Sequence, residues 1–223
     1  MERHVNMQEI SDGRKYRRND MAKLGCSECA GCSECCHKVG DSIVLDPWDV
    51  HMLTTHLAAS FEELMEGNRV ALGVVDGLIL PHIQIENEEV GCSFLNGEGR
   101  CSIHSFRPGM CRLFPLGRLY EDGGFSYFLQ TEECRVQKRS KVKISKWLDI
   151  PELERYEKYI NQWHYFCKGI QVNARDMEEE VLKNCNMYVL QNFFVASYEN
   201  EDFYGQFERR LARAKATLGM ATI

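Results

Sequence analysis

The chain has 223 residues, of which 44% are hydrophobic and 27% are charged, and its formal net charge is −6 at pH 7. This composition fits an ordinary globular core and excludes extended disorder, and the negative charge argues against a protein that neutralises nucleic-acid phosphates. We interpret the two basic runs, 14–18 and 138–146, as solvated faces and expect no nucleic-acid partner.

Residues 1–25 form a charged N-terminal segment without the apolar core of a signal peptide. No apolar run approaches the length of about eighteen residues that a membrane span needs, so we expect neither export nor a membrane partner. A cytoplasmic, reducing location is therefore expected, where the eleven cysteines are better explained as metal ligands than as disulfides.

A dense cysteine run follows, with five cysteines within eleven residues: Cys26, Cys29, Cys32, Cys35 and Cys36. Two residues separate each of the first four, a spacing that lets neighbouring thiolates bind one metal ion or cluster. The run therefore predicts a chelating loop. Because adjacent side chains on an extended chain point to opposite faces, Cys35 and Cys36 should not easily bind the same ion. One of them could serve a second centre, act as a reactive thiolate or pack as a small hydrophobe.

Short elements are predicted after this run. Residues 43–45 resemble a strand, and the Asp-Pro pair at 46–47 begins a helix. Ser60 and Glu63 form a capping box for a second helix, which ends near Gly67.

Two hairpins are predicted further along the chain. The first covers 69–85 with its turn at 76–77, and Pro81 indicates an edge strand. The second covers 116–130 and turns at 122–124. This second hairpin would hold Cys111 and Cys134, which lie on either side of it in the sequence, near one end of a sheet.

The second cysteine region, 91–135, contains Cys92, Cys101, Cys111 and Cys134 around a turn at 96–99. Beyond Ser145 the apolar residues recur at helical spacing almost without a break. Cys167 and Cys185 lie among aromatic residues in these helices, so we interpret both as buried thiols.

These elements predict an α+β protein with a small cysteine-rich metal-binding core, short β-hairpins and a mainly helical C-terminal region. We expect three parts: the charged segment 1–25, a cysteine-cluster metal-binding domain over 26–144, and a helical region over 145–223 that packs on it.

The motifs resemble those of a known family. The second cysteine region carries C-S-I-H-S-F-R-P-G-M-C-R-L-F-P over 101–115, after Cys92-Ser-Phe-Leu, and the first run carries Cys29, Cys32, Cys35 and Cys36. In this order the motifs resemble the CxxCxxCC cysteine-cluster family, whose domain is described as zinc- or iron-chelating and which includes the flagellin lysine N-methylases. Cys26 is an addition to the usual pattern, and it leaves the register of the first ligand open.

The resemblance implies a metalloprotein and raises the possibility of protein or peptide modification. The best-described branch uses an iron-sulfur cluster and S-adenosylmethionine to methylate lysine side chains, so that cofactor and a protein or peptide substrate are expected here too. No G-x-G-x-x-G element follows a strand, so an ordinary nucleotide-type site for S-adenosylmethionine is absent from the sequence.

Eight thiolates could complete two four-cysteine sites: Cys29, Cys32, Cys35, Cys36, Cys92, Cys101, Cys111 and Cys134. Such donors suit zinc or iron and disfavour magnesium and calcium. Three closely spaced thiolates with one distant cysteine are typical of four-iron clusters, and the second region lacks a second C-x-x-C knuckle. We therefore expect a 4Fe-4S cluster, with zinc as the alternative.

Basic side chains lie beside these ligands. Arg107 and Arg112 flank Cys111, where they could offset thiolate charge, bind an anionic group of a cofactor or substrate, or pair with local acids. His37 and His104 could replace a thiolate, but we interpret both as surface residues or as hydrogen-bond partners of the site.

Three functions remain open on the sequence: an iron-sulfur enzyme that modifies a protein or peptide, a zinc-stabilised interaction scaffold, and a metal chaperone or sensor without catalysis. The sequence identifies neither the catalytic base nor the oligomeric state.

Overall fold

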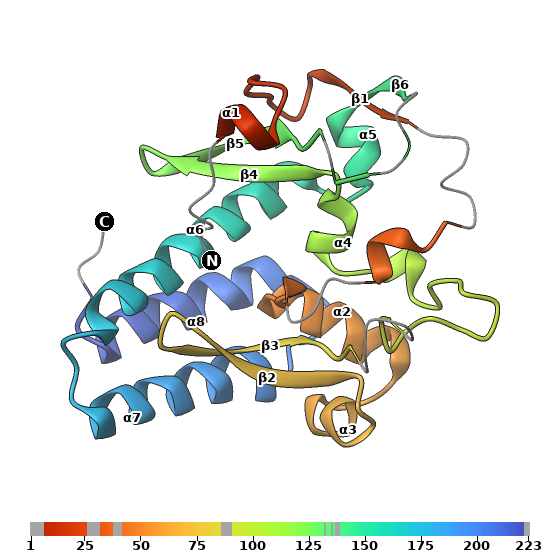
Figure 1. The fold of residues 1–223 in the computed structure, drawn as a ribbon. Coiled ribbons are helices and arrows are strands. Elements are labelled where there is room, and N and C mark those ends of the chain that lie inside the picture. Colours follow the sequence, from red (N-terminus) through yellow and green to blue (C-terminus); the bar gives the residue numbers. More distant parts are fainter. Residues whose placement is uncertain are drawn as a thin grey trace. The chain divides into compact units, whose positions relative to one another are not determined.

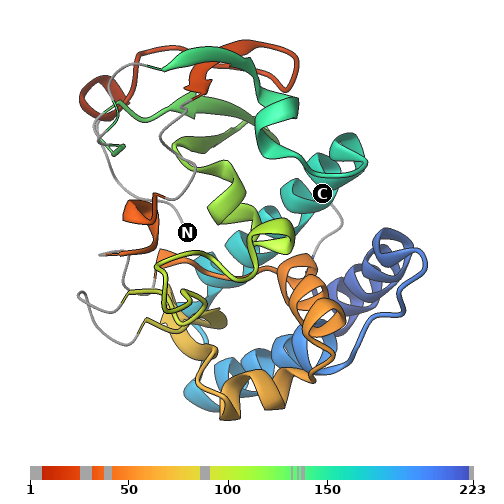
Figure 2. The same ribbon diagram turned by 90° about the vertical axis from the view of Figure 1, so that its right-hand side faces the viewer.

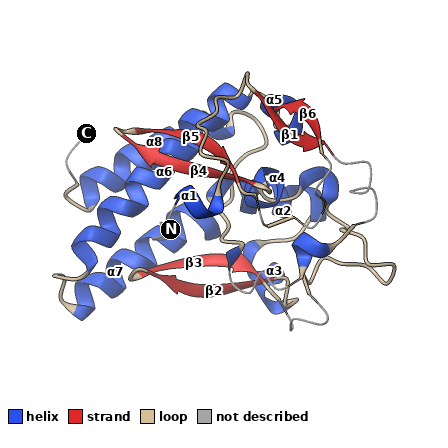
Figure 3. Cartoon of the chain, turned by 45° about the horizontal axis from the view of Figure 1, so that its top comes forward, coloured by secondary structure: helices blue, strands red, loops and turns tan. Residues whose placement is uncertain are grey.

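The computed structural model describes residues 7–25, 32–37, 42–85, 91–131, 133–134, 136 and 139–220. Helices alternate there with three antiparallel strand pairs, and the C-terminal region is helical, so the predicted α+β class is confirmed (Figures 1 and 3). The chain forms two compact units, one from Val44–Gln84 with Arg155–Ile223 and the other from Glu2–Ile43 with Ile85–Glu154. Both units are discontinuous in sequence.

The unit that carries both cysteine regions consists of short elements: α1 (Met7–Ile10), β1 (Met21–Gly25), the 3-10 turns Glu34–Cys36 and His104–Phe106, α4 (Gly109–Leu113), β4 (Leu116–Glu121), β5 (Gly124–Leu129), β6 (Ser140–Lys143) and α5 (Ile144–Leu148). Strands β4 and β5 form the hairpin predicted around 122–124, with Leu116 opposite Leu129. Asp122 and Gly123 both have positive φ, at 51° and 76°. This is the backbone that a two-residue turn needs to match the twist of its strands.

The N-terminal segment takes part in this unit, which its charge pattern did not indicate. Strand β1 pairs antiparallel with β6, placing Met21 opposite Lys143. Tyr16 and Tyr127 exchange backbone hydrogen bonds of 2.8 and 2.9 Å, which attach the segment to β5. In β1 the side chains alternate between exposed and buried, and Leu24 is fully buried.

The helical unit consists of α2 (Pro47–Leu57), α3 (Phe61–Glu66), β2 (Val70–Val75), β3 (Leu78–Ile83), α6 (Leu153–Ala174), α7 (Glu179–Leu190), the π-helical turn Gln191–Val195 and α8 (Phe203–Thr217). Both predicted helix starts are confirmed. Asp46 and Asp49 form a capping box for α2, and Ser60 and Glu63 form one for α3.

The strand predicted over 43–45 is wrong in extent. Val44 makes a single bridge to His82, and Leu45 N donates to Pro81 O at 2.8 Å. The chain cannot extend this pairing, because Asp46 is already the N-cap of α2.

Aromatic rings fill the core of the helical unit. Trp163 contacts Phe193 and Phe194 of the π-helical turn, with ring centroids 5.2 and 5.8 Å apart. Helices α2 and α3 also contact this turn, and Figure 2 shows them beside the C-terminal helices. Cys167 and Cys185 are buried thiols, as predicted. Among the described residues no helix is both long enough and apolar enough to cross a membrane.

Candidate metal centre

The end of the first cysteine run forms a tight turn. Cys36 N donates to Ser33 O at 2.8 Å, and His37 N donates to Glu34 O at 3.2 Å, which closes the 3-10 turn. In a 3-10 helix successive side chains are separated by about 120°, whereas on an extended strand they alternate. Cys35 and Cys36 can therefore face one group, and their thiols hydrogen-bond each other. The expectation that adjacent cysteines face apart assumed an extended chain, which the structure does not have here.

One backbone hydrogen bond connects this turn to the second cysteine region. Cys92 N donates to Cys36 O at 2.9 Å. Gly91 precedes it with φ of +81°, and a Cβ at this position would lie 2.8 Å from Cys36 O and 2.7 Å from His37 Nδ1. The close approach of the two loops therefore requires a glycine, both for its φ and for the lack of a side chain.

The loop after Cys92 returns the chain to the same place. Leu95 and Cys101 form an isolated bridge, and Ser102 N donates to Phe94 O at 2.9 Å. The predicted turn at 96–99 closes this loop, with Asn96 Oδ1 accepting from the backbone N–H groups of Glu98 and Arg100. The loop thus brings Cys101 back toward Cys92.

We call Cys35, Cys36, Cys92 and Cys101 the four-thiol cluster, because these side chains influence one another electrostatically. The hydrogen bond with Cys35 raises the pKa of Cys36 far above its usual range, and burial and the charges of the other three thiols add to this effect. The same hydrogen bond lowers the pKa of Cys35 to about 7. Burial is the main cause that raises the pKa of Cys101. The four thiols are therefore close enough for the charge of one to change the pKa of another.

Arg107 lies beside this cluster. Its positive charge lowers the pKa values of both Cys35 and Cys101. Its Nη1 donates to His104 O at 3.0 Å and lies within 3.0 Å of both ring nitrogens of His104. Burial, followed by the charges of Arg107 and Arg112, lowers the pKa of His104. A neutral imidazole is therefore favoured next to the guanidinium.

Arg112 has a different environment. Only 4% of it is exposed, and its guanidinium donates to the carbonyl oxygens of Ser105, Arg107, Leu148 and Asp149. The first two belong to the loop that carries Arg107, and the last two lie at the end of α5. Arg112 therefore clamps that loop to α5, a role the sequence did not reveal.

The remaining predicted ligands lie outside the four-thiol cluster. Cys111 lies on α4, and Cys32 and Cys134 are half-buried. Cys26 and Cys29 lie outside the described residues. The nine described cysteines are all thiols. Within the described ranges, no three His, Cys, Asp or Glu side chains form a group that could hold a metal ion. The thiol donors fit zinc or iron by their chemistry.

Comparison with known proteins identifies the family. The sequence model of the CxxCxxCC family, described as a putative zinc- or iron-chelating domain, matches residues 28–168, which is more than half of the chain. The chain belongs to the CxxCxxCC family. Its match covers the first run from Cys29 onward, the whole second cysteine region and the start of the helical region. No curated protein and no solved structure shows significant similarity to this CxxCxxCC protein.

Proposed function

We propose that this CxxCxxCC protein binds its metal at the four-thiol cluster and that the bound group is a 4Fe-4S cluster. The observation that carries the proposal is the hydrogen bond from Cys92 N to Cys36 O, 2.9 Å long. It brings together two cysteine regions that are far apart in the sequence. The membership of the chain in a family described as zinc- or iron-chelating supports the same proposal.

The choice of iron over zinc rests on the donor pattern. Thiolates are soft ligands that suit both metals, but closely spaced thiolates with distant cysteines are typical of iron-sulfur proteins. The other four predicted ligands, Cys29, Cys32, Cys111 and Cys134, are proposed for a second group, since eight cysteines could complete two four-cysteine sites. A bound iron-sulfur group would supply electron transfer, or an open iron position for a reacting molecule.

Two arginines would support such a group. Cys35 and Cys101 must be thiolates to bind metal, and the guanidinium of Arg107 favours their charged forms. Arg107 could also meet an anionic group of a cofactor or substrate at the same place. Arg112 donates a hydrogen bond of 3.1 Å to the backbone carbonyl of Arg107, so it holds the loop from which that side chain extends.

The proposed activity is modification of a protein or peptide in the cytoplasm, with methyl transfer from S-adenosylmethionine to lysine as the first reaction to test. The resemblance to the flagellin lysine N-methylases supports this part of the proposal. A zinc scaffold or a metal chaperone is the alternative outcome.

The deciding experiment measures iron, zinc and acid-labile sulfide in protein purified without oxygen. We expect iron and sulfide in equal amounts, at about four per site. Cys36→Ser and Cys101→Ser should lose most of the metal. Cys185→Ser should keep it, because Cys185 is a buried thiol of α7 in the other unit. Zinc without sulfide would replace the iron-sulfur proposal with the scaffold or chaperone. A metal content that neither cluster variant changes would reject the proposed ligands.

Calorimetry then tests whether the metal-loaded protein binds S-adenosylmethionine, as the proposed methyl transfer requires. Binding that disappears in Arg107→Ala, at unchanged metal content, would place the cofactor beside the cluster. No binding to the loaded protein would remove methyl transfer from the proposal and leave metal binding in place.

A further inference from the structure

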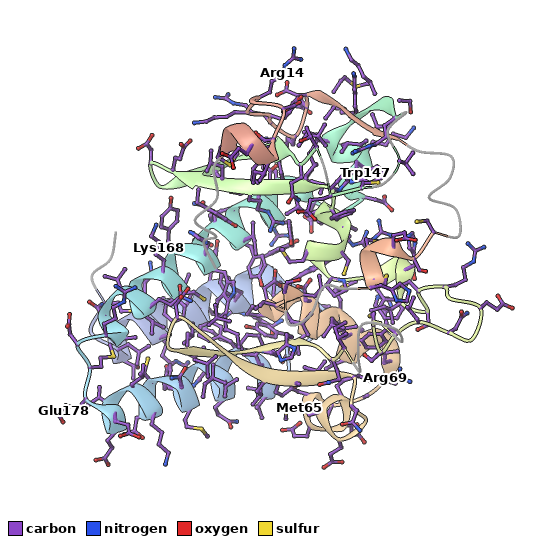
Figure 4. All side chains as sticks on the ribbon, in the orientation of Figure 1. Arg14, Met65, Arg69, Trp147, Lys168 and Glu178 are labelled. Carbon is purple, nitrogen blue, oxygen red and sulfur yellow. The ribbon has the colours of Figure 1, made fainter. Side chains whose placement is uncertain are left out.

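The structure brings the two basic runs of the sequence side by side. Strand β1, which follows the run 14–18, pairs antiparallel with β6, which lies within the run 138–146 (Figure 1). A backbone hydrogen bond from Ser145 N to Arg18 O, 2.9 Å long, extends this contact beyond the strands. Figure 4 labels Arg14, which belongs to the first of these runs. Positive charges from distant parts of the sequence therefore gather around one strand pair.

One face of this strand pair carries three lysines. In β1 the exposed side chains are Met21 and Lys23. The register places Lys143 opposite Met21, and it places Lys141 opposite Lys23. Residues directly opposite each other in an antiparallel pair lie on the same face, with Cβ atoms about 4.5–5.5 Å apart. We call Met21, Lys23, Lys141 and Lys143 the lysine face; its lysines are exposed, and Met21 is 51% exposed.

The charges of the lysine face are not neutralised by their described surroundings. In the ranges that the structure describes, none of its three lysines forms an ion pair. Arg18 of the same region, in contrast, is paired with Glu154 at 3.1 Å. The carboxylate of Asp20, directly before β1, accepts a hydrogen bond of 2.7 Å from Arg17 N. The lysine face is therefore available to an anionic group from outside the chain.

The pairing of Lys23 with Lys141 costs stability in the free protein. Like charges directly opposite each other across a strand pair repel. The chain as a whole has a formal net charge of −6, so this arrangement does not follow from a basic composition. Carboxylates between the two ammonium groups would turn the repulsion into attraction. The register itself therefore indicates a binding surface for anions.

We propose that the lysine face binds an acidic segment of a polypeptide, with carboxylates at the lysines and an apolar side chain against Met21. Strand β1 ends at Gly25, which pairs with Ser140 and directly precedes Cys26. The chain thus leads from this face straight into the first cysteine run. The role of the segment rests on the proposed function, in which it belongs to the protein or peptide that is modified.

Strand geometry supports a polypeptide as the occupant. Lys141 and Lys143 are two residues apart on one strand, so their Cα atoms are separated by about 6.5–7 Å. Acidic residues at alternate positions of an extended segment have the same separation, and their carboxylates can meet both lysines. The exposed Met21 beside them offers an adaptable apolar contact, as methionines at protein interfaces do.

The aromatic residues near the face do not favour a nucleic acid. Single-stranded nucleic acids bind by stacking bases on exposed rings. Tyr16 is only 8% exposed. Trp147, labelled in Figure 4, is half-buried, and its Nε1 donates to Phe114 O at 3.1 Å. The lysine face also lacks arginine, whose planar fork suits phosphate best. These features favour carboxylates on a peptide over phosphates on a nucleic acid.

The test measures fluorescence anisotropy of a labelled peptide of alternating glutamate and serine with one leucine, added to the full chain with its metal. Binding should weaken as salt rises, because the charges are exposed. Lys23→Gln/Lys141→Gln should raise the dissociation constant about ten-fold. The matched control is Lys183→Gln/Lys215→Gln, which removes the same charge from α7 and α8 and should leave the dissociation constant unchanged.

Stability gives an independent readout of the same lysines. Lys23→Gln should raise the free energy of unfolding at low salt, because it removes the repulsion with Lys141. The variant should therefore fold, and its metal content should equal that of the wild type. Peptide binding is measured separately from metal content, so a failure of the proposed metal centre and a failure of this proposal give different results.

Two results with the peptide would overturn the proposal. One is an acidic peptide that binds no more tightly than its counterpart with glutamine in place of glutamate. The other is equal binding to the wild type and to Lys23→Gln/Lys141→Gln. Tighter binding of a single-stranded oligonucleotide, or of vesicles containing phosphatidylserine, with the same dependence on these lysines would overturn the choice of a polypeptide and assign the face to that partner.

Discussion

The amide of Cys92 donates a 2.9 Å hydrogen bond to the carbonyl oxygen of Cys36. This bond lies between backbone groups, so it holds the two cysteine regions together whether or not their thiols bind metal. It also accounts for Gly91, whose φ of +81° and missing Cβ allow the approach. The metal centre proposed here therefore depends on a backbone contact as well as on the cysteines.

Replacement of Gly91 by alanine tests this dependence. The added Cβ would lie 2.8 Å from Cys36 O, and an L-residue at this φ is strained. We expect the free energy of unfolding to fall by about 1–3 kcal/mol and the metal content to fall with it. Urea unfolding and metal analysis of the same preparation measure both effects.

Gly123→Ala is the matched control, because Gly123 has φ of +76° but nothing within 4 Å of an added Cβ. It should lose stability through backbone strain alone and keep its metal. Equal metal content in both variants would contradict the proposed importance of the contact.

Arg112→Met tests the clamp between the Arg107 loop and α5. The change leaves the carbonyl groups of Ser105, Arg107 and Asp149 without a buried cationic donor. We expect a loss of about 2–4 kcal/mol in the free energy of unfolding, measured with denaturant on the metal-loaded protein. Arg107→Met should change stability much less, because Arg107 is only half-buried. Equal losses of unfolding free energy in the two variants would show that Arg112 contributes no more to stability than Arg107, which would contradict the clamp.

Local signals in the sequence predicted much of the fold. The helix start at Asp46-Pro47 and the capping box of Ser60 with Glu63 involve only neighbouring residues, and both form as expected. The turn at Asp122 and Gly123 is equally local. Contacts between distant segments left no such signal. The pairing of β1 with β6 joins a charged N-terminal segment to residues far along the chain, and no local pattern specifies that partner.

The candidate site shows the same limit. The spacing of the cysteines predicted a group of candidate ligands, but not that Cys36 would contact Cys92. Gly91 was the available clue, since a glycine directly before a ligand cysteine can mark a close backbone approach. The sequence could not separate the roles of Arg107 and Arg112, because both flank Cys111. Their burial separates them: Arg112 is buried and clamps the loop, whereas Arg107 is half-buried and lies beside the thiols.

Tyr159→Phe tests a buried hydrogen-bond network in the helical unit. The Tyr159 hydroxyl accepts from Trp48 N and donates to Asp46 Oδ1, both at 2.9 Å, and Asp46 also caps α2. Removing the hydroxyl leaves the amide without this acceptor and the carboxylate without this donor. We expect a loss of about 1–3 kcal/mol in the free energy of unfolding at unchanged metal content. Tyr188→Phe is the control and should cost less than about 0.5 kcal/mol, because the hydrogen bond from the Tyr188 hydroxyl to Thr217 is exposed and 3.5 Å long.

His51 should make the stability of the helical unit depend on pH. The imidazole is 9% exposed and stacks on Phe203, with centroids 5.3 Å apart. Burial, followed by the charge of His56, lowers the pKa of His51 below its ordinary value of 6.5. Between the lowered pKa and 6.5 the unfolded chain binds more protons than the folded chain. The stabilisation by neutral His51 is therefore complete above about pH 6.5 and is lost as the pH falls toward the lowered value.

His51→Phe keeps an aromatic ring beside Phe203 and removes the ionisable group. From about pH 7.5 to about pH 5, the wild type should lose more unfolding free energy than this variant does, as measured by urea titration at fixed metal content. His56→Gln should reduce the pH dependence without abolishing it, because burial is the larger cause of the shift in His51. Parallel pH profiles for the wild type and His51→Phe would assign the acid sensitivity to other groups, since a buried neutral histidine must otherwise contribute to it.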